Sequence, residues 1–218
     1  MTYSQPQGFL AVPTTGTGPG VLVLHAWWGL NDTIKQVCTR LSEAGFTAFA
    51  PDLYHGQLAT TIPEAKRLSQ ALDDRQAYAD VVRAADFLSE RAAQGNEGLA
   101  VIGFSMGSSF GLSLSAADPG RIRAVVTFYG AGEGDFSQSK ASYLGHFADL
   151  DEYEPEEYII GLEQLLRDAG RPVTFHRYPD TSHWFFEPDR SDVYNPGAAA
   201  LAWDRTLVFL KESLPLDS

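Results

Sequence analysis

A serine between two glycines is the first group in this chain that could do chemistry. Gly103-Phe104-Ser105-Met106-Gly107 fits the pattern G-x-S-x-G and follows the apolar run 99–102. When a strand precedes this pattern and a helix follows it, the chain turns sharply and presents the serine hydroxyl above the edge of the sheet. The glycines leave room in a turn where Cβ atoms would collide. The pattern therefore predicts that Ser105 is a nucleophile.

A second match to the same pattern, residues 107–111, overlaps the first and centres on Ser109. Ser109 would lie a full turn inside the helix that follows Ser105. Because no strand end presents its hydroxyl, we interpret Ser109 as structural.

A serine nucleophile needs a base to accept its proton, and that base needs an acceptor that holds its tautomer. In α/β-hydrolases these groups follow in the order serine, acid, histidine. His183 lies in the loop after the last predicted strand, which is the position that this order requires. The other four histidines precede the motif or fall inside predicted strands: His25, His55, His146 and His176. We therefore predict that His183 is the base.

The acid is expected in the loop after the predicted strand that ends near Phe147. Asp149, Asp151 and Glu152 all lie in this loop. Spacing alone leaves the three alternatives open, and most carboxylates of this acidic stretch are expected to be solvated.

Strands and helices alternate along the chain, which predicts an α/β fold with a mainly parallel central sheet and helices on both faces. Apolar runs too short for helices predict strands at 9–12, 21–24, 46–50, 99–102, 124–129, 143–147 and 173–178. Amphipathic stretches with caps predict helices at 32–44, 63–72, 73 to about 94, 106–117, 155–170 and 198–214. Trp203, Leu207 and Leu210 on the last helix are expected in the core. The segment 53–73 is too short for a separate lid, so we predict one domain, residues 1–218, without a large cap domain.

Composition limits the possible partners and compartments. The net charge of −12 disfavours nucleic acid, which needs a basic surface. No apolar run approaches the roughly 20 residues that span a bilayer, and the N-terminus lacks the features of a signal peptide. The lone cysteine, Cys38, lies on the apolar stripe of a predicted helix and is expected to be a buried thiol. We expect a cytoplasmic protein with no membrane partner. No cluster has metal-ligand spacing, so no metal or other cofactor is expected.

Several blocks of the chain resemble the dienelactone hydrolase family. They are the residues 27–31, 103–107, 145–147, 151–155 and 182–185, which occur in the family's order. The resemblance implies an α/β-hydrolase fold and selects Asp151 as the acid, because the family's acid begins a D-x-x-x-P pattern. Asp149 is the second choice. One oxyanion-hole donor is expected to be the backbone N–H of Met106, at the start of the helix. The resemblance implies that the other is the backbone N–H of Trp27.

The chain departs from the well-known members of the family at three positions. Ser105 stands in place of their cysteine, and Ala26 in place of a glutamate that contacts the thiol. Glu187 stands where members that cleave dienelactone have an arginine that holds the substrate carboxylate. Ala26, Trp28, Trp184, Phe185 and Glu187 are the residues we expect around the substrate pocket.

Together these features predict a serine esterase that cleaves small neutral esters or lactones through an acyl-serine intermediate, as a monomer or a homodimer. Two alternatives remain: another acyl or organophosphate hydrolase that uses the same triad, and a catalytically silent scaffold used for binding.

Overall fold

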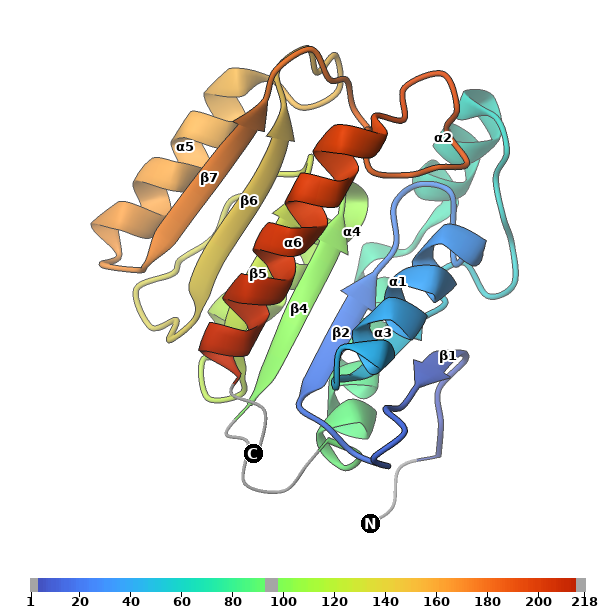
Figure 1. The fold of residues 1–218 in the computed structure, drawn as a ribbon, viewed down its shortest axis with the longest axis vertical. Coiled ribbons are helices and arrows are strands. Elements are labelled where there is room, and N and C mark those ends of the chain that lie inside the picture. The colour runs from blue at the N-terminus through green and yellow to red at the C-terminus, as the bar shows by residue number, and fades with distance from the viewer. Residues whose placement is uncertain (1–3, 93–97, 215–218) are drawn as a thin grey trace.

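The computed structural model of the protein describes residues 4–92 and 98–214, and within them a seven-stranded sheet is flanked by helices (Figure 1). The strands are Gly8–Ala11 (β1), Gly20–Leu24 (β2), Thr47–Pro51 (β3), Leu99–Phe104 (β4), Ile122–Phe128 (β5), Ser142–Ala148 (β6) and Val173–Tyr178 (β7). The helices are Asp32–Glu43 (α1), Ile62–Ala71 (α2), Asp74–Ser89 (α3), Met106–Ala117 (α4), Glu156–Asp168 (α5) and Pro196–Ser213 (α6). None of these helices is both long and apolar enough to cross a membrane.

The strands lie in the order β1-β3-β2-β4-β5-β6-β7, and only β1 runs antiparallel to its neighbour. The register pairs Leu24 with Gly103, and Phe104 with Phe128. The carboxyl ends of the parallel strands therefore meet at one edge of the sheet, shown at the top of Figure 1. In open parallel sheets this edge is where ligands bind.

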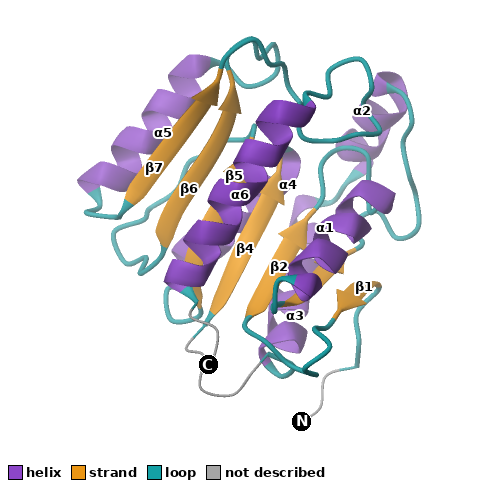
Figure 2. Ribbon diagram, viewed as in Figure 1, coloured by secondary structure: helices purple, strands orange, loops and turns teal. Residues whose placement is uncertain are grey.

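Helices cover both faces of the sheet, which explains why the central strands are apolar along their whole length. Helices α1 and α6 lie in front of the sheet in Figure 2, and α3, α4 and α5 lie behind it. Each face has its own core of buried side chains. Trp203 and Leu210 of α6 belong to the core on the face covered by α1 and α6, and Leu207 packs against this core, as predicted. Cys38 is also buried there, and burial raises the pKa of its thiol to about 12.

Side-chain caps mark where helices begin. The Asn31 side chain accepts a hydrogen bond from the backbone of Ile34 at the start of α1, and Thr61 and Glu64 form a capping box at the start of α2. Asp73 caps α3, so this helix begins at Asp74 and not at Asp73 as predicted. It ends at Ser89, earlier than the predicted end near Gln94, a position that lies outside the described residues.

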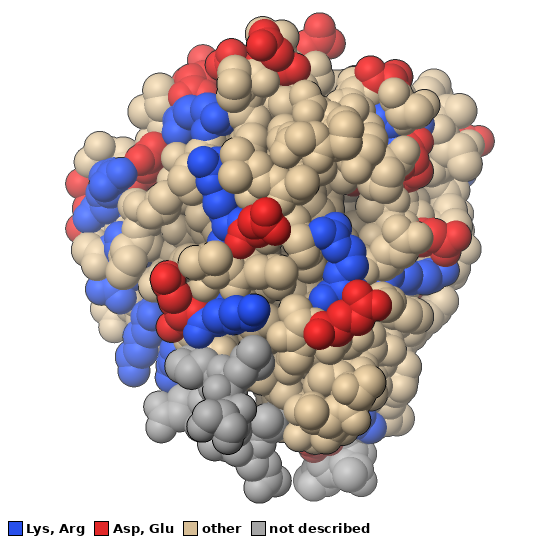
Figure 3. Space-filling model, in the orientation of Figure 1, with Lys and Arg blue, Asp and Glu red and all other residues tan. Residues whose placement is uncertain are grey.

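The α/β-hydrolase fold without a large cap domain is confirmed within the described residues. Between β3 and α3 there is a loop and the ten-residue helix α2, whose Ala65 and Leu68 pack into the core of the sheet. On the face shown in Figure 3, acidic and basic side chains are interspersed.

Candidate active site

Ser105 sits in a sharp turn between β4 and α4. Its backbone has φ 49° and ψ −115°, a conformation that non-glycine residues rarely adopt. Its backbone N–H donates to the carbonyl of Phe128 on the neighbouring strand at 2.9 Å, and its carbonyl accepts from Ser108 at 2.8 Å. These bonds to β5 and to the first turn of α4 hold the strained residue in place. The predicted elbow is therefore present at Ser105.

The two glycines of the motif allow the backbone to approach closely on both sides of the elbow. A Cβ on Gly103 would lie 2.5 Å from the backbone nitrogen of Ser108. A Cβ on Gly107 would lie 2.7 Å from the carbonyl carbon of Leu24 and 2.8 Å from the carbonyl oxygen of His25. Real Cβ atoms do not come this close to backbone atoms. Glycine at position 107 therefore lets the first turn of α4 lie directly against the segment that follows β2.

The structure brings Ser105, His183 and Asp151 together in one hydrogen-bonded chain. The Nε2 atom of His183 is 2.9 Å from Ser105 Oγ, and its Nδ1 atom is 2.8 Å from Asp151 Oδ2. The side chains of His183 and Asp151 are only 4% and 3% exposed. A carboxylate acceptor at Nδ1 holds the proton on that nitrogen, so Nε2 has a free lone pair for the serine hydroxyl. This arrangement can activate a hydroxyl as a nucleophile.

Asp151 is held by its own loop. Its Oδ1 atom accepts hydrogen bonds from the backbone N–H groups of Tyr153 at 2.8 Å and Glu154 at 2.9 Å. Such an Asx turn fixes the carboxylate before it meets the histidine. Of the three carboxylates that the sequence left open, the structure brings only this one to His183, and Asp149 and Glu152 are exposed.

The backbone N–H groups of Met106 and Trp27 are the ones predicted to stabilise a reacting carbonyl oxygen. Met106 is the first residue of α4, and the first N–H groups of a helix have no acceptor within the helix. Trp27 follows β2, two residues after the His25 carbonyl that lies against Gly107. Both residues line the same hollow as Ser105. Their assignment as oxyanion-hole donors stays a prediction.

His25 is a supporting residue that the sequence reasoning set aside. Its Nδ1–H donates to the carbonyl of Ala26 at 2.7 Å, and its Nε2 accepts from the backbone N–H of Leu53 at 3.2 Å. Burial lowers the pKa of His25 and favours the neutral ring that this pattern requires. The side chain thus joins the segment before Trp27 to the loop after β3. Its place at the end of a strand was a signal for this role, because that strand end leads into the predicted oxyanion loop.

The hollow at Ser105 has a volume of about 200 Å³. Its lining residues are Trp27, Ser105, Met106, Ser109, Tyr153, Glu154, His183 and Trp184. Of the five residues expected around the pocket, Trp184 is the one in this lining. Four of the five are at most 2% exposed and do not line this hollow: Ala26, Trp28, Phe185 and Glu187. Tyr153 and Glu154 were missed, although the D-x-x-x-P block contains both.

Aromatic rings surround the histidine. The ring of Tyr153 lies 5.3 Å from that of His183, 4.7 Å from that of Trp184 and 5.9 Å from that of Trp27. Trp184 also meets His183 edge to face at 4.7 Å. Aromatic pairs in these geometries add about 1 kcal/mol each beyond burial.

Glu187 is placed differently from its expected position. It is fully buried, and the hydroxyl of Tyr129 donates to its Oε1 atom at 2.7 Å. The Tyr129 ring in turn lies 4.9 Å from the ring of His183. Burial raises the pKa of Glu187 to about 8, with Asp189 adding to the effect, so this carboxyl is mostly protonated at neutral pH. A buried and mostly neutral carboxyl does not repel an anionic substrate, so Glu187 gives no reason to expect selection against one.

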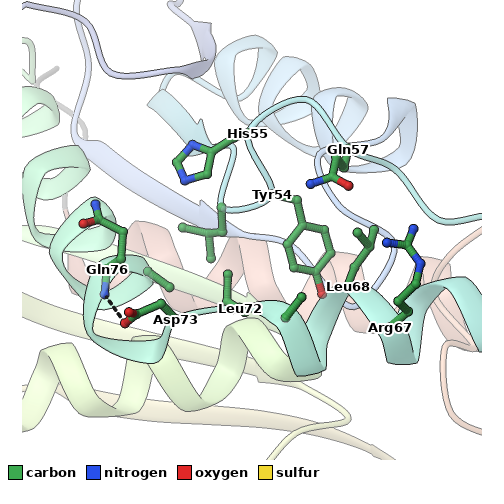
Figure 4. A pocket seen from close by; sticks show the side chains of 11 residues that line it. Tyr54, His55, Gln57, Arg67, Leu68, Leu72, Asp73 and Gln76 are labelled. Carbon is green, nitrogen blue, oxygen red and sulfur yellow. Dashed lines mark hydrogen bonds between the residues drawn. The ribbon is translucent and has the colours of Figure 1, made fainter.

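Other hollows lie near this edge of the sheet. One of about 370 Å³ is formed by the loop 53–57 together with α2 and α3, and Tyr54 and Leu68 point into it (Figure 4). The hydroxyl of Tyr54 reaches the sulfur of Met106 at 3.7 Å, so this hollow lies behind the elbow. Among the described residues, no group of three or more His, Cys, Asp or Glu side chains is arranged to hold a metal ion.

The sheet, the elbow and the hydrogen-bonded chain at its edge define an α/β-hydrolase. A family model described as the dienelactone hydrolase family matches residues 7–214. The chain is 33% identical over 217 residues to "Protein usf" of Aquifex pyrophilus, which covers 95% of this chain and 94% of that protein. The chain belongs to the dienelactone hydrolase family and is a hydrolase of that family.

A further relative agrees with this assignment, and a solved structure agrees with the fold. A protein of Bradyrhizobium sp named "Probable 2-oxo-3-(5-oxofuran-2-ylidene)propanoate lactonase" is 30% identical over 220 residues, which cover 93% of this chain and 88% of that protein. The crystal structure of a dienelactone hydrolase-like promiscuous phosphotriesterase from metagenomic libraries has a TM-score of 0.80 and 24% identity. That match covers 91% of this chain and 88% of the other, and it supports the fold.

The elbow gives a first prediction. Gly107→Val should lower the melting temperature by roughly 6–12 °C, because a branched Cβ must displace backbone at a cost on the order of 3 kcal/mol. Activity should fall with it. Gly161→Val is the matched control, because a Cβ on Gly161 of α5 meets nothing within 4 Å. Thermal melting of both variants is the measurement, and equal melting temperatures would contradict the strained elbow.

The buried carboxyl of Glu187 gives a second prediction. Its pKa is about 8 in the folded state against an ordinary value of 4.5, so the native state binds more protons between these values. The free energy of unfolding should therefore fall as pH rises from 5 to 8, by up to about 4 kcal/mol relative to Glu187→Gln. Urea unfolding at several pH values measures this difference. The exposed Glu157→Gln is the control, and parallel curves for wild type and Glu187→Gln would contradict the prediction.

Proposed function

We propose that this hydrolase cleaves small neutral esters or lactones through an acyl-serine intermediate, with Ser105 as nucleophile, His183 as base and Asp151 as the acid that orients the base. The observation that carries the proposal is the continuous hydrogen-bonded chain from Ser105 Oγ through His183 to Asp151 at one hollow. The lactonase name of the Bradyrhizobium relative supports the ester and lactone class. The cytoplasmic location is part of the same proposal.

The reaction follows from the roles of these groups. His183 Nε2 takes the hydroxyl proton as Ser105 Oγ attacks the carbonyl carbon, and Asp151 stabilises the resulting imidazolium. The N–H groups of Met106 and Trp27 bind the oxyanion of the tetrahedral intermediate, where one such donor contributes about 10²–10³ in kcat. His183 then returns the proton to the leaving oxygen, and the acyl group stays on Ser105. Water, activated by the same histidine, hydrolyses the acyl-serine. With a lactone, the leaving hydroxyl stays part of the acyl chain on Ser105, and this last step releases a hydroxy acid.

The residue types around the nucleophile fit a serine rather than a thiol. Ala26 stands at the position where the family resemblance leads one to expect a glutamate that contacts the thiol. A hydroxyl therefore depends on His183 alone as its base, and His183 is 2.9 Å from it. The serine and the alanine are consistent with one mechanism.

The triad gives a third prediction. Ser105→Ala, His183→Ala and Asp151→Asn should each lower kcat by roughly 10³-fold or more while the fold is kept, because triad members act as a unit. Asp149→Asn is the control and should stay close to wild type, since Asp149 is exposed. Hydrolysis of p-nitrophenyl acetate measures the effect. A large loss in Asp149→Asn with an active Asp151→Asn would contradict the choice of acid.

Labelling with a fluorophosphonate probe separates the enzyme from a silent scaffold. Only an activated serine reacts quickly with this reagent. Wild type should be labelled and Ser105→Ala should not. An unlabelled wild-type protein would favour the binding scaffold.

The charge around the hollow gives a fourth prediction. Glu154 lines the hollow. Burial raises the pKa of its carboxyl, and the nearby charge of Asp151 raises it further by a smaller amount. A carboxylate on the substrate would meet like charge there, at a cost on the order of 1–4 kcal/mol. The methyl ester of an acidic substrate should therefore be preferred over the free carboxylate by about tenfold in kcat/KM, which needs about 1.4 kcal/mol.

Steady-state kinetics on such a matched pair of substrates tests the charge argument. Glu154→Gln should narrow the preference for the methyl ester. Glu187→Gln should leave the ratio unchanged, because Glu187 is buried behind the histidine. Equal turnover of the free carboxylate and its ester by wild type would contradict the argument.

A further inference from the structure

A second hollow, of about 410 Å³, lies beside the one at Ser105. We call it the α5 groove, because one wall is the helix α5 and the other is the loop that follows β5. Its lining residues are Ala131, Gly132, Glu133, Glu154, Glu157, Tyr158, Gly161, Leu162 and Leu165. The proposed ester hydrolysis assigns no role to this groove.

The α5 groove adjoins the hollow at Ser105. Glu154 lines both. Ser109, on the wall of the hollow, donates a hydrogen bond from Oγ to the carbonyl of Ala131 at 3.2 Å. A Cβ on Gly132 would lie 3.7 Å from Ser109 Cα, in ordinary van der Waals contact. The Ala131 backbone also forms a hydrogen bond with the Glu154 carboxyl. The junction of the two spaces is therefore the connected set Glu154, Ala131 and Ser109, over which a substituent passes from one space to the other.

The sizes of the two spaces indicate that they work together. The hollow at Ser105 holds about 200 Å³, whereas binding sites for small molecules are typically about 300–1,000 Å³. The ester carbonyl and its nearest atoms fill the hollow, and a longer substituent must leave it. The α5 groove offers the additional volume on the side of Glu154.

The walls of the α5 groove select the kind of substituent. Leu162 is buried at its floor, and Leu165 and Tyr158 are 42% and 60% exposed beside it. Large apolar side chains exposed around a hollow mark a surface that another molecule can cover. Glu133 and Glu157 are exposed at the rim, and Glu154 lies at the junction. This floor favours an apolar substituent on the ester, and the acidic rim disfavours a negative charge on that substituent.

The position of His183 indicates which half of the ester enters the groove. His183 must protonate the leaving oxygen, so the alcohol half starts on the histidine side. There another hollow, of about 450 Å³, is lined by His183 and by Leu150 and Val193. The α5 groove opens from the side of Glu154 and Ser109. The half that stays on Ser105 is therefore directed toward α5.

We propose that the α5 groove is an acyl subsite that holds the apolar arm of a medium-chain acyl group, uncharged or cationic at its end. The proposal rests on the ester hydrolysis at Ser105 proposed above. It makes the α5 groove the place where the enzyme distinguishes long from short acyl groups.

Gly161 allows a direct test, because it lines the groove and a Cβ added there meets nothing within 4 Å. Gly161→Trp should fill the groove without displacing the fold, and Gly161→Ala is the matched control that leaves the groove open. Tryptophan and alanine are both better helix formers than glycine. In Gly161→Trp, kcat/KM for p-nitrophenyl octanoate should fall about tenfold or more. The value for p-nitrophenyl acetate should stay within about twofold, and Gly161→Ala should keep the wild-type ratio of the two.

Several outcomes would overturn the acyl subsite. Equal losses on octanoate and acetate, or no loss on either, would do so. A loss that followed the length of the alcohol, measured on octyl and ethyl acetates, would also do so. Leu165→Asp places a charge on an exposed wall residue and should lower the octanoate value alone, which keeps the proposal testable if Gly161→Trp does not fold.

The same measurements distinguish failure of the subsite from failure of the proposed function. If Ser105→Ala still hydrolyses p-nitrophenyl acetate, the acyl-serine reaction and the subsite fail together. If Ser105→Ala is inactive but Gly161→Trp keeps the wild-type ratio of octanoate to acetate, only the subsite fails.

Charge at the end of the arm gives an independent readout. The p-nitrophenyl ester of an acid that ends in an ammonium group should be turned over at least about tenfold faster than one that ends in a carboxylate. Glu157→Lys should narrow this gap, since Glu157 is at the rim. A wild-type enzyme that turned over both at the same rate would overturn the charge selection.

Discussion

The constraint on which this site depends is the close approach of backbone at the elbow. The first turn of α4 lies against the segment after β2 with no room for a side chain at Gly107. That contact brings together the two segments that carry the N–H groups proposed for the oxyanion hole, because Met106 begins the helix and Trp27 follows His25. The strained backbone of Ser105 is one cost of the arrangement, on the order of 1–3 kcal/mol. Its hydrogen bonds to β5 and α4 offset part of this cost. The bonds to β5 and α4 thus hold Ser105 in a backbone conformation that an isolated turn would not keep.

The fold was predictable because its signals are local. Apolar runs too short for helices, such as 21–24, occur as central strands, and capped amphipathic stretches occur as helices. Errors were confined to the ends of elements, as at Asp73, whose side chain caps α3 from outside the helix. A capping residue and a first helical residue share the same sequence signal, so the boundary shifts by one.

The site was predictable to different depths. The motif predicts Ser105 as the nucleophile, and the chain order predicts His183 as the base, without any knowledge of distances. The acid was open among three carboxylates, because residues two apart in a loop can both reach a histidine. The Asx turn at Asp151 is what separates them, and it depends on backbone conformation around Tyr153 and Glu154. The wall of the hollow was least predictable. Trp28 and Trp184 are the same residue type beside the same site, yet only Trp184 lines it. The side of a loop that faces the hollow is set by the backbone turn, and Trp184 itself has φ +65°.

Glu187 shows how one residue difference can turn a side chain away from the substrate and into the interior. At the position where the family resemblance leads one to expect a cation for the substrate, this chain has a carboxyl that turns inward. There it accepts a hydrogen bond from Tyr129, whose ring packs against His183, and burial keeps the carboxyl mostly protonated at neutral pH. In the proposed reaction, a charged group at that place would lie near the imidazolium and alter its pKa. A neutral carboxyl holds Tyr129, whose ring packs on the histidine, and the proposal leaves the charge of the imidazolium to Asp151. The acidic group proposed to meet the substrate is then Glu154, at the junction between the hollow and the α5 groove. In this proposal one glutamate supports the base through Tyr129, and the other selects the substrate by its charge.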